Sequence, residues 1–222
     1  MSEVKQVAQP KFLRVVATIL SYILHPVFMP LYMTLVLYWL APVSFVGVST
    51  HQYGWWLIQI AQWTLFYPLL VVVLLKALGF IKSVLMHDPK DRIVPLMAAM
   101  VFYFWGFHVF NSINTLPNNH VVIPLILKVL LLGSFWGVIA IFMLNIFFKV
   151  SMHATAAGSM IGILIVLMLT SPVNMVVPFF IALLIAGLMG TIRMVLGAHR
   201  IGEIWAGYIL GLLVMLGAYW YI

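Results

Sequence analysis

The feature that most limits the fold of this chain is a series of long apolar segments in which charged side chains are almost absent. The stretch Val121–Phe148, for example, contains a single charged residue, Lys128. An apolar run of about 20 residues is long enough to cross the hydrocarbon core of a bilayer as a helix. Transmembrane barrels instead show short segments of alternating polarity. We therefore expect an all-α polytopic membrane protein.

The composition supports the same fold class and limits the partners. Hydrophobic residues make up 65% of the chain and charged residues 7%, whereas a soluble domain has about 25% charged residues. We expect a polar basic N-terminus over residues 1–11 and one transmembrane domain over residues 12–222. Without cysteine the chain forms no disulfide and has no thiolate. The net charge of +7 suits membrane lipids and phosphates, and we expect no nucleic acid partner because no soluble basic surface is present.

The apolar segments predict a bundle of six or seven transmembrane helices. The uncertainty in number comes from Phe12–Leu24, which is predicted to lie in the membrane interface and to end at a helix break at His25–Pro26. Val27–Phe45 then completes or forms the first span. The remaining predicted spans are Trp55–Phe80, Ile93–Ile113, Val121–Phe148, Ala154–Leu169, Met175–Val195 and Ile204–Trp220.

With seven spans, three polar segments fall on the same face of the membrane as the N-terminus. They are Lys82–Arg92, Lys149–His153 and Arg193–Glu203, and this face carries ten of the 11 Lys and Arg residues. An excess of Lys and Arg in short loops is typical of the cytoplasmic side. We therefore expect these segments to be cytoplasmic, although one span fewer would reverse the assignment.

The third of these segments has the strongest chemical pattern. Glu203 is one of only 4 acidic residues in the chain, and it follows His199 by four positions. Positions four apart share a face on a helix, so we expect Glu203 to accept a hydrogen bond from one ring nitrogen of His199 and leave the other as a nucleophile. Arg193 offers a guanidinium fork that matches phosphate oxygens. Ionisable groups in an apolar membrane segment are costly, so by default they indicate a functional site.

Together the three polar segments resemble the motifs of the type-2 phosphatidic acid phosphatase superfamily. Its third motif is Ser-Arg, five residues, His, three residues and Asp, and here Arg193, His199 and Glu203 have that spacing, with Ile192 in place of the serine. Its second motif is Pro-Ser-Gly-His, which here is Val150-Ser-Met-His153. Its first motif is a lysine, six residues and Arg-Pro, and Lys90-Asp-Arg92-Ile-Val-Pro95 has those residue types at a different spacing.

The resemblance implies a membrane-embedded lipid phosphatase with no metal or other cofactor. It gives His199 the role of nucleophile, Glu203 that of its orienting partner and His153 that of general acid. The residues implied to bind phosphate are Arg193, Arg92, Ser151 and Lys90. The candidate substrates are a polyprenyl diphosphate, phosphatidate, phosphatidylglycerol phosphate or a lipid A phosphate. The implied location is the bacterial inner membrane, where most relatives are expected to act on the outer face, against the charge argument above. The oligomeric state is left open.

Two alternatives remain at this stage. The departures from the family motifs at Val150, Met152 and Ile192 are compatible with a non-catalytic lipid-phosphate binder or transporter of the same fold. Asp88-Pro-Lys-Asp91 is also similar to the Asp-x-x-Asp motif of membrane prenyltransferases, which bind diphosphate through magnesium. That chemistry requires a second aspartate cluster, and the chain contains no other aspartate.

Overall fold

The computed structural model describes residues 9–81, 93–113 and 122–222. Within these ranges the chain forms helices and no strand, as the apolar pattern predicts. The helical elements are α1 Lys11–Ile23, η1 Pro26–Phe28, α2 Met29–Leu40, η2 Pro42–Phe45, α3 Thr50–Ala61, η3 Gln62–Phe66, α4 Tyr67–Ala77, α5 Ile93–Ile113, α6 Leu125–Phe147, α7 Met152–Thr170, α8 Val176–Val195 and α9 Ile201–Tyr221.

Seven helical segments of the described ranges are long and apolar enough to cross a membrane. The first, Lys11–Leu40, combines α1 and α2, and the second, Thr50–Ala77, combines α3 and α4. The other five are α5 to α9. Large apolar side chains such as Trp39 and Leu184 are exposed on the outside of the bundle. In water such a surface would be unfavourable, and in a bilayer it meets the lipid chains.

The interruptions within the first two spans have local causes. The first helix ends at Ile23, and Pro26 begins η1 two residues after the C-cap Leu24, which confirms the predicted break at His25–Pro26. The second span contains a π-helical turn, Gln62–Phe66, which ends two residues before Pro68. Because proline has no N–H to donate to the preceding turn, a local irregularity here is expected.

The helix starts differ from the predictions by a few residues. The second span was expected to begin at Trp55, but α3 begins at Thr50 because the Ser49 hydroxyl accepts a hydrogen bond of 3.2 Å from the Gln52 N–H. The last helix was expected to begin at Ile204, but α9 begins at Ile201. Glu203 therefore lies in the first turn of α9 rather than before it, which matters for the site described below.

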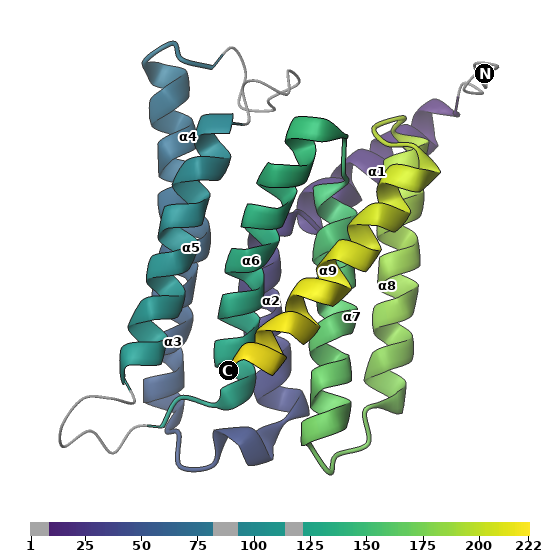
Figure 1. Cartoon of the computed structure of the whole chain (residues 1–222). Helices are drawn as coiled ribbons and strands as arrows, with labels where there is room; N and C mark the ends of the chain where they lie inside the picture. The colour runs from purple at the N-terminus through teal and green to yellow at the C-terminus, as the bar shows by residue number, and fades with distance from the viewer. Residues whose placement is uncertain (1–8, 82–92, 114–121) are drawn as a thin grey trace.

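The bundle is built around α7, the most buried of the seven spans. It packs against α9 most closely and also against α6 and α8. In Figure 1, α9 runs diagonally across the front of α7, while α3, α4 and α5 form the left side of the bundle. The amphipathic helix α1 lies against α8. This contact brings the N-terminal part of the chain next to its C-terminal third.

Glycine residues allow α7 and α9 to approach within backbone contact. A methyl group at Gly211 on α9 would overlap the carbonyl oxygen of Thr155 on α7, and one at Gly158 on α7 would overlap the carbonyl oxygen of Tyr208 on α9. The Ser159 hydroxyl also donates to the Gly211 carbonyl at 3.3 Å. Small residues spaced four apart are a common means of close helix packing in membranes. Here the glycines bring the first two turns of α7 against the α9 backbone at Tyr208 and Gly211.

The polar junctions lie at one end of the bundle. The end of α4, the start of α5, the α6–α7 junction and the α8–α9 turn all lie at the top of Figure 1, together with the N-terminal end of α1. This arrangement agrees with the parity predicted from seven spans. The polar loop Lys82–Arg92 lies outside the described residues, and with it the candidate phosphate ligands Lys90 and Arg92.

Candidate functional site

The start of α7 and the α8–α9 turn are joined by hydrogen bonds at this end of the bundle. The Ser151 N–H donates to the Glu203 carbonyl oxygen at 3.2 Å, and the Lys149 ammonium donates to the Ala198 carbonyl oxygen at 2.7 Å. The second and third polar segments found in the sequence are therefore in direct contact. They bring together the first turns of two helices, whose N-terminal ends carry a partial positive charge.

The predicted pair of His199 and Glu203 is present. His199 Nδ1 lies 2.8 Å from Glu203 Oε2, and the two side chains are 6% and 22% exposed. A carboxylate accepts hydrogen bonds, so Nδ1 carries the proton and the lone pair of the neutral ring lies on Nε2. Nε2 is thus the nitrogen that retains nucleophilic character. This is the tautomer that a phosphohistidine mechanism requires.

The geometry that forms this pair is not the one predicted. We expected His199 and Glu203 to share the face of a helix, but His199 lies in the non-helical turn between α8 and α9. That turn reverses at Gly197, which has a φ of 64° that few other residues adopt. Glu203 Oε2 also accepts from the Arg200 N–H at 3.3 Å. Arg200 is the N-cap of α9, so the same carboxylate caps the helix and orients the histidine.

Burial and nearby cations keep His199 neutral. Desolvation lowers the pKa of His199 below its ordinary value of 6.5, and the charges of Arg193 and Lys149 lower it further. The hydrogen bond from His199 to Glu203 and the negative charge of Glu203 oppose this shift. The lowered pKa means that the free base, which is the nucleophilic form, is the dominant form at neutral pH. Arg193 and Lys149 also lie close enough to His199 to attract an anion bound there.

Arg193, in the last turn of α8, contacts a residue that the sequence analysis did not select. Its Nη1 donates to the Ser21 hydroxyl of α1 at 3.0 Å. His153 Nε2 lies 3.1 Å from the Ser21 carbonyl oxygen and 3.3 Å from its hydroxyl oxygen. Because a carbonyl only accepts, Nε2 of His153 carries the proton. Ser21 therefore connects the arginine of the third motif with the histidine of the second.

His25 joins the same group. Its ring packs edge-on against the His153 ring, with centroids 5.4 Å apart and an interplanar angle of 83°. Its Nδ1 accepts from the Val27 N–H at 3.3 Å, which supports the turn at the end of α1. We call Ser21, His25, His153 and Arg193 the Ser21 cluster. The sequence indicated a helix break at His25, and the only further signal of a site was a histidine in an otherwise apolar segment.

Ser151 has a structural task that the sequence analysis did not predict. It is fully buried, and its hydroxyl oxygen accepts from the Ala154 N–H at 3.3 Å as the N-cap of α7. Its carbonyl accepts from the Thr155 hydroxyl at 3.1 Å. Capping uses only a lone pair of the hydroxyl oxygen, but the side chain is fully buried, so the role of Ser151 as a phosphate ligand stays a prediction.

The described residues of the site suit an anion held beside a neutral histidine. Arg193 and Lys149 supply positive charge, the α7 and α9 N-termini add to it, and His199 supplies a nucleophilic nitrogen. Comparison with protein families, with curated proteins and with solved structures finds no match to this chain. A functional assignment therefore depends on the chemistry of these residues.

Proposed function

We propose that this protein is an integral membrane phosphatase that removes phosphate from a lipid phosphate or diphosphate through a phosphohistidine. The observation that carries the proposal is the 2.8 Å contact between His199 Nδ1 and Glu203, formed where Arg193 and Lys149 act on the same histidine. This combination provides a neutral nucleophile, a carboxylate that stabilises its positive charge after attack, and cations for phosphate oxygens. The resemblance of the motifs to type-2 phosphatidic acid phosphatases supports the same assignment.

In the proposed reaction, the Nε2 lone pair of His199 attacks phosphorus and the bond from phosphorus to the lipid oxygen breaks. The leaving oxygen takes a proton from a general acid, for which His153 is our candidate. Water then attacks the phosphohistidine and gives a proton back to His153, and inorganic phosphate leaves as the P–N bond breaks and its electron pair returns to Nε2. Arg193 binds the phosphate oxygens during both steps. Because His153 Nε2–H is bonded to Ser21, transfer of its proton requires that bond to break.

We place the reaction on the membrane face that carries most of the Lys and Arg residues, which the charge distribution assigns to the cytoplasm. A bacterial inner membrane provides the lipid phosphates named above. An amphiphilic substrate reaches a site at the end of the bundle laterally from the bilayer.

The test is phosphate release from a panel of lipid phosphates by purified wild type, His199→Ala and His51→Ala in the presence of EDTA. His51 is a matched control, since it lies in the first turn of α3 and outside the site. We expect His199→Ala to lose at least about 10³-fold in rate, His51→Ala to keep the wild-type rate, and vanadate to inhibit. Equal rates for wild type and His199→Ala would contradict the proposal.

A non-catalytic lipid-phosphate binder or transporter is the second candidate, favoured by two observations. Ser21 already occupies hydrogen-bonding positions of both Arg193 and His153. In addition, the motif departures Val150 and Ile192 are buried apolar side chains, 1% and 4% exposed. Absence of phosphate release from every lipid, with binding of a non-hydrolysable lipid phosphonate intact in wild type and His199→Ala, would establish this second candidate.

A further inference from the structure

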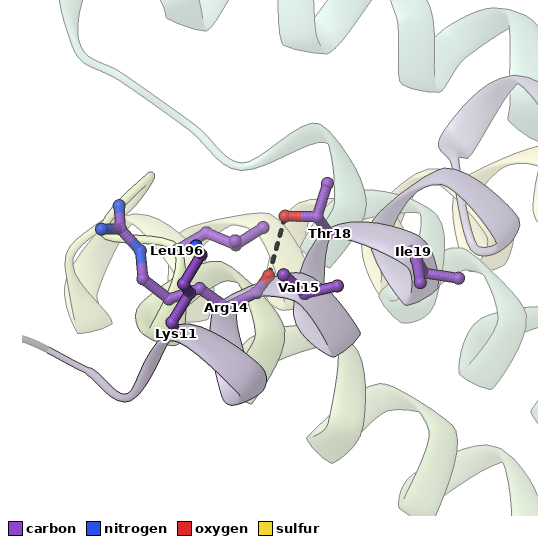
Figure 2. Close-up of a pocket in the computed structure, with 6 residues that line it drawn as sticks. All are labelled: Lys11, Arg14, Val15, Thr18, Ile19 and Leu196. Atoms are coloured by element: carbon purple, nitrogen blue, oxygen red, sulfur yellow. Dashed lines mark hydrogen bonds between the residues drawn. The ribbon is translucent and has the colours of Figure 1, made fainter.

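A second basic feature lies on α1, on the same end of the bundle as the site but without sharing a residue with it. A shallow, open surface groove is lined by Lys11, Arg14, Val15, Thr18, Ile19 and Leu196. Figure 2 shows that α1 supplies all of these except Leu196, which belongs to the turn after α8. The groove therefore lies where α1 rests against the end of α8.

The two sides of this groove differ in chemistry. Lys11 and Arg14 are exposed cations three positions apart, so they lie on one face of the first turns of α1. Val15 and Ile19 are about half exposed, and with Leu196 they form an apolar wall. The Thr18 hydroxyl donates to the Arg14 carbonyl oxygen at 2.8 Å, which leaves the hydroxyl oxygen as an acceptor toward the groove.

Such a groove matches the headgroup region of a phospholipid. Two cations neutralise a phosphate, and an apolar wall next to them accepts the glycerol end of an acyl chain. The N-terminal end of α1 has no side-chain cap, so its partial positive charge adds to that of the cations. A soluble anion such as inorganic phosphate would use only the charged side of the groove.

We propose that this groove binds an anionic phospholipid of the surrounding leaflet, of the phosphodiester class represented by phosphatidylglycerol. A phosphodiester is not a substrate of the phosphomonoester chemistry proposed for His199, so this lipid is a bound membrane component and not the substrate. Its contacts bridge α1 and the α8–α9 turn through Leu196. Because α1 also carries Ser21, the lipid holds in place the helix that contacts Arg193 and His153.

The test uses the full-length protein, stripped of lipid in detergent and offered an equal mixture of phosphatidylglycerol and phosphatidylcholine, with retained lipid measured by native mass spectrometry. We expect wild type to retain phosphatidylglycerol preferentially. The double variant Lys11→Gln/Arg14→Gln should lose about 25-fold in affinity for it, at about fivefold for each cation. Lys76→Gln/Lys128→Gln removes the same charge outside the groove and should lose less than about threefold.

Several results would overturn the proposal. They are equal retention of the two lipids by wild type, equal losses in the two double variants, and displacement of phosphatidylglycerol by inorganic phosphate at millimolar concentration, which would indicate a site for free anions. A second measurement does not depend on variants that fold. Phosphatidylglycerol with a photoreactive headgroup should label wild type within residues 11–19, and absence of label there would also contradict the proposal.

These readouts are independent of the proposed phosphatase activity. His199→Ala should retain phosphatidylglycerol as well as wild type does, because His199 does not line the groove. A protein that binds this lipid but releases no phosphate would keep the present inference and lose the proposed function. A protein that releases phosphate but does not prefer phosphatidylglycerol would keep the proposed function and contradict the present inference.

Discussion

The two parts of the candidate site are held together in different ways. The His199–Glu203 pair is formed by residues four positions apart and is supported by the first turn of α9. The Ser21 cluster instead joins residues separated by 132 and 172 positions, through the contacts of Ser21 with His153 and Arg193. The first depends on a local turn and a helix cap, and the second on how α1, α7 and α8 pack. The His199–Glu203 pair therefore depends on one short segment of the chain, whereas the Ser21 cluster forms only when the helices of the bundle pack together.

The largest expected effect concerns the local pair. Glu203→Gln keeps the size of the side chain but removes the charge that stabilises a positively charged His199 after attack. If the protein is a phosphatase, we expect the rate to fall about 10²-fold, which corresponds to about 2.7 kcal/mol of transition-state stabilisation. The measurement is kcat for phosphate release. Because Glu203 acts through His199, it is a positioning residue, and a structural cap alone would not affect kcat this strongly.

The pH profile distinguishes these two roles of Glu203. The nucleophile must be neutral, so activity is present above the pKa of His199 in the folded protein and is lost as the pH falls through it. Burial lowers this pKa, so the acidic limb of wild type should lie below pH 6.5. Glu203→Gln removes interactions that raise the pKa, so its acidic limb should move to still lower pH. A shift to higher pH would show that His199 is not the titrating group.

The next effect concerns the packing that brings the two parts together. Gly211→Ala places a methyl group against the Thr155 carbonyl oxygen, so α7 and α9 must separate. We expect a loss of about 2 kcal/mol in the free energy of unfolding and a melting temperature lower by about 4–8 °C. Thermal unfolding of the purified protein in detergent measures the change in melting temperature.

Gly187→Ala is the matched control for this substitution. Gly187 lies in α8, and beyond the backbone of its own helix an added methyl group meets no atom within 4 Å among the described residues, and alanine is the better helix former. Its melting temperature should stay equal or rise. A similar decrease in both variants would mean that the α7–α9 contact has no special part in stability.

The smallest effect concerns the Ser21 cluster. Ser21→Ala removes the hydroxyl that accepts from Arg193 and leaves the carbonyl that accepts from His153. We expect a loss of about 1 kcal/mol in the free energy of unfolding, the usual contribution of one hydrogen bond. Under the proposed function we also expect a KM about threefold lower, since Arg193 is released from a competing partner. Thermal unfolding and steady-state kinetics measure the two effects.

Thr18→Ala tests whether the cross-helix contact is the cause. Among the residues that the structure describes, the Thr18 hydroxyl bonds to the Arg14 carbonyl on its own helix, so its removal should change the free energy of unfolding by less than about 0.5 kcal/mol and leave KM unchanged. Equal effects of the two variants would indicate that α1 responds to any loss of a hydroxyl group.

The sequence by itself determined the fold class and most of the spans. Apolar runs of sufficient length require helices in a bilayer because every backbone polar group must be paired within the segment. Proline determined the break after α1, because it has no N–H with which to continue the helix. The sequence also indicated the contact between His199 and Glu203, since residues this close along the chain meet in a helix and also in a capped turn. Which of these two geometries holds depended on the positive φ at Gly197.

Only the tertiary structure decided the surroundings of that pair. The α7–α9 contact requires glycines on both helices to coincide in space, as Gly158 and Gly211 do with the opposing backbones. The position of α1 against α8 turns Ser21 and His25 into neighbours of His153 and creates the basic groove beside Leu196. Apolar faces of similar composition pack against several partners with similar energy, so periodicity does not specify which helices meet. The complementary shapes of the helix surfaces select which helices pack together, and this packing determines which polar residues share a site.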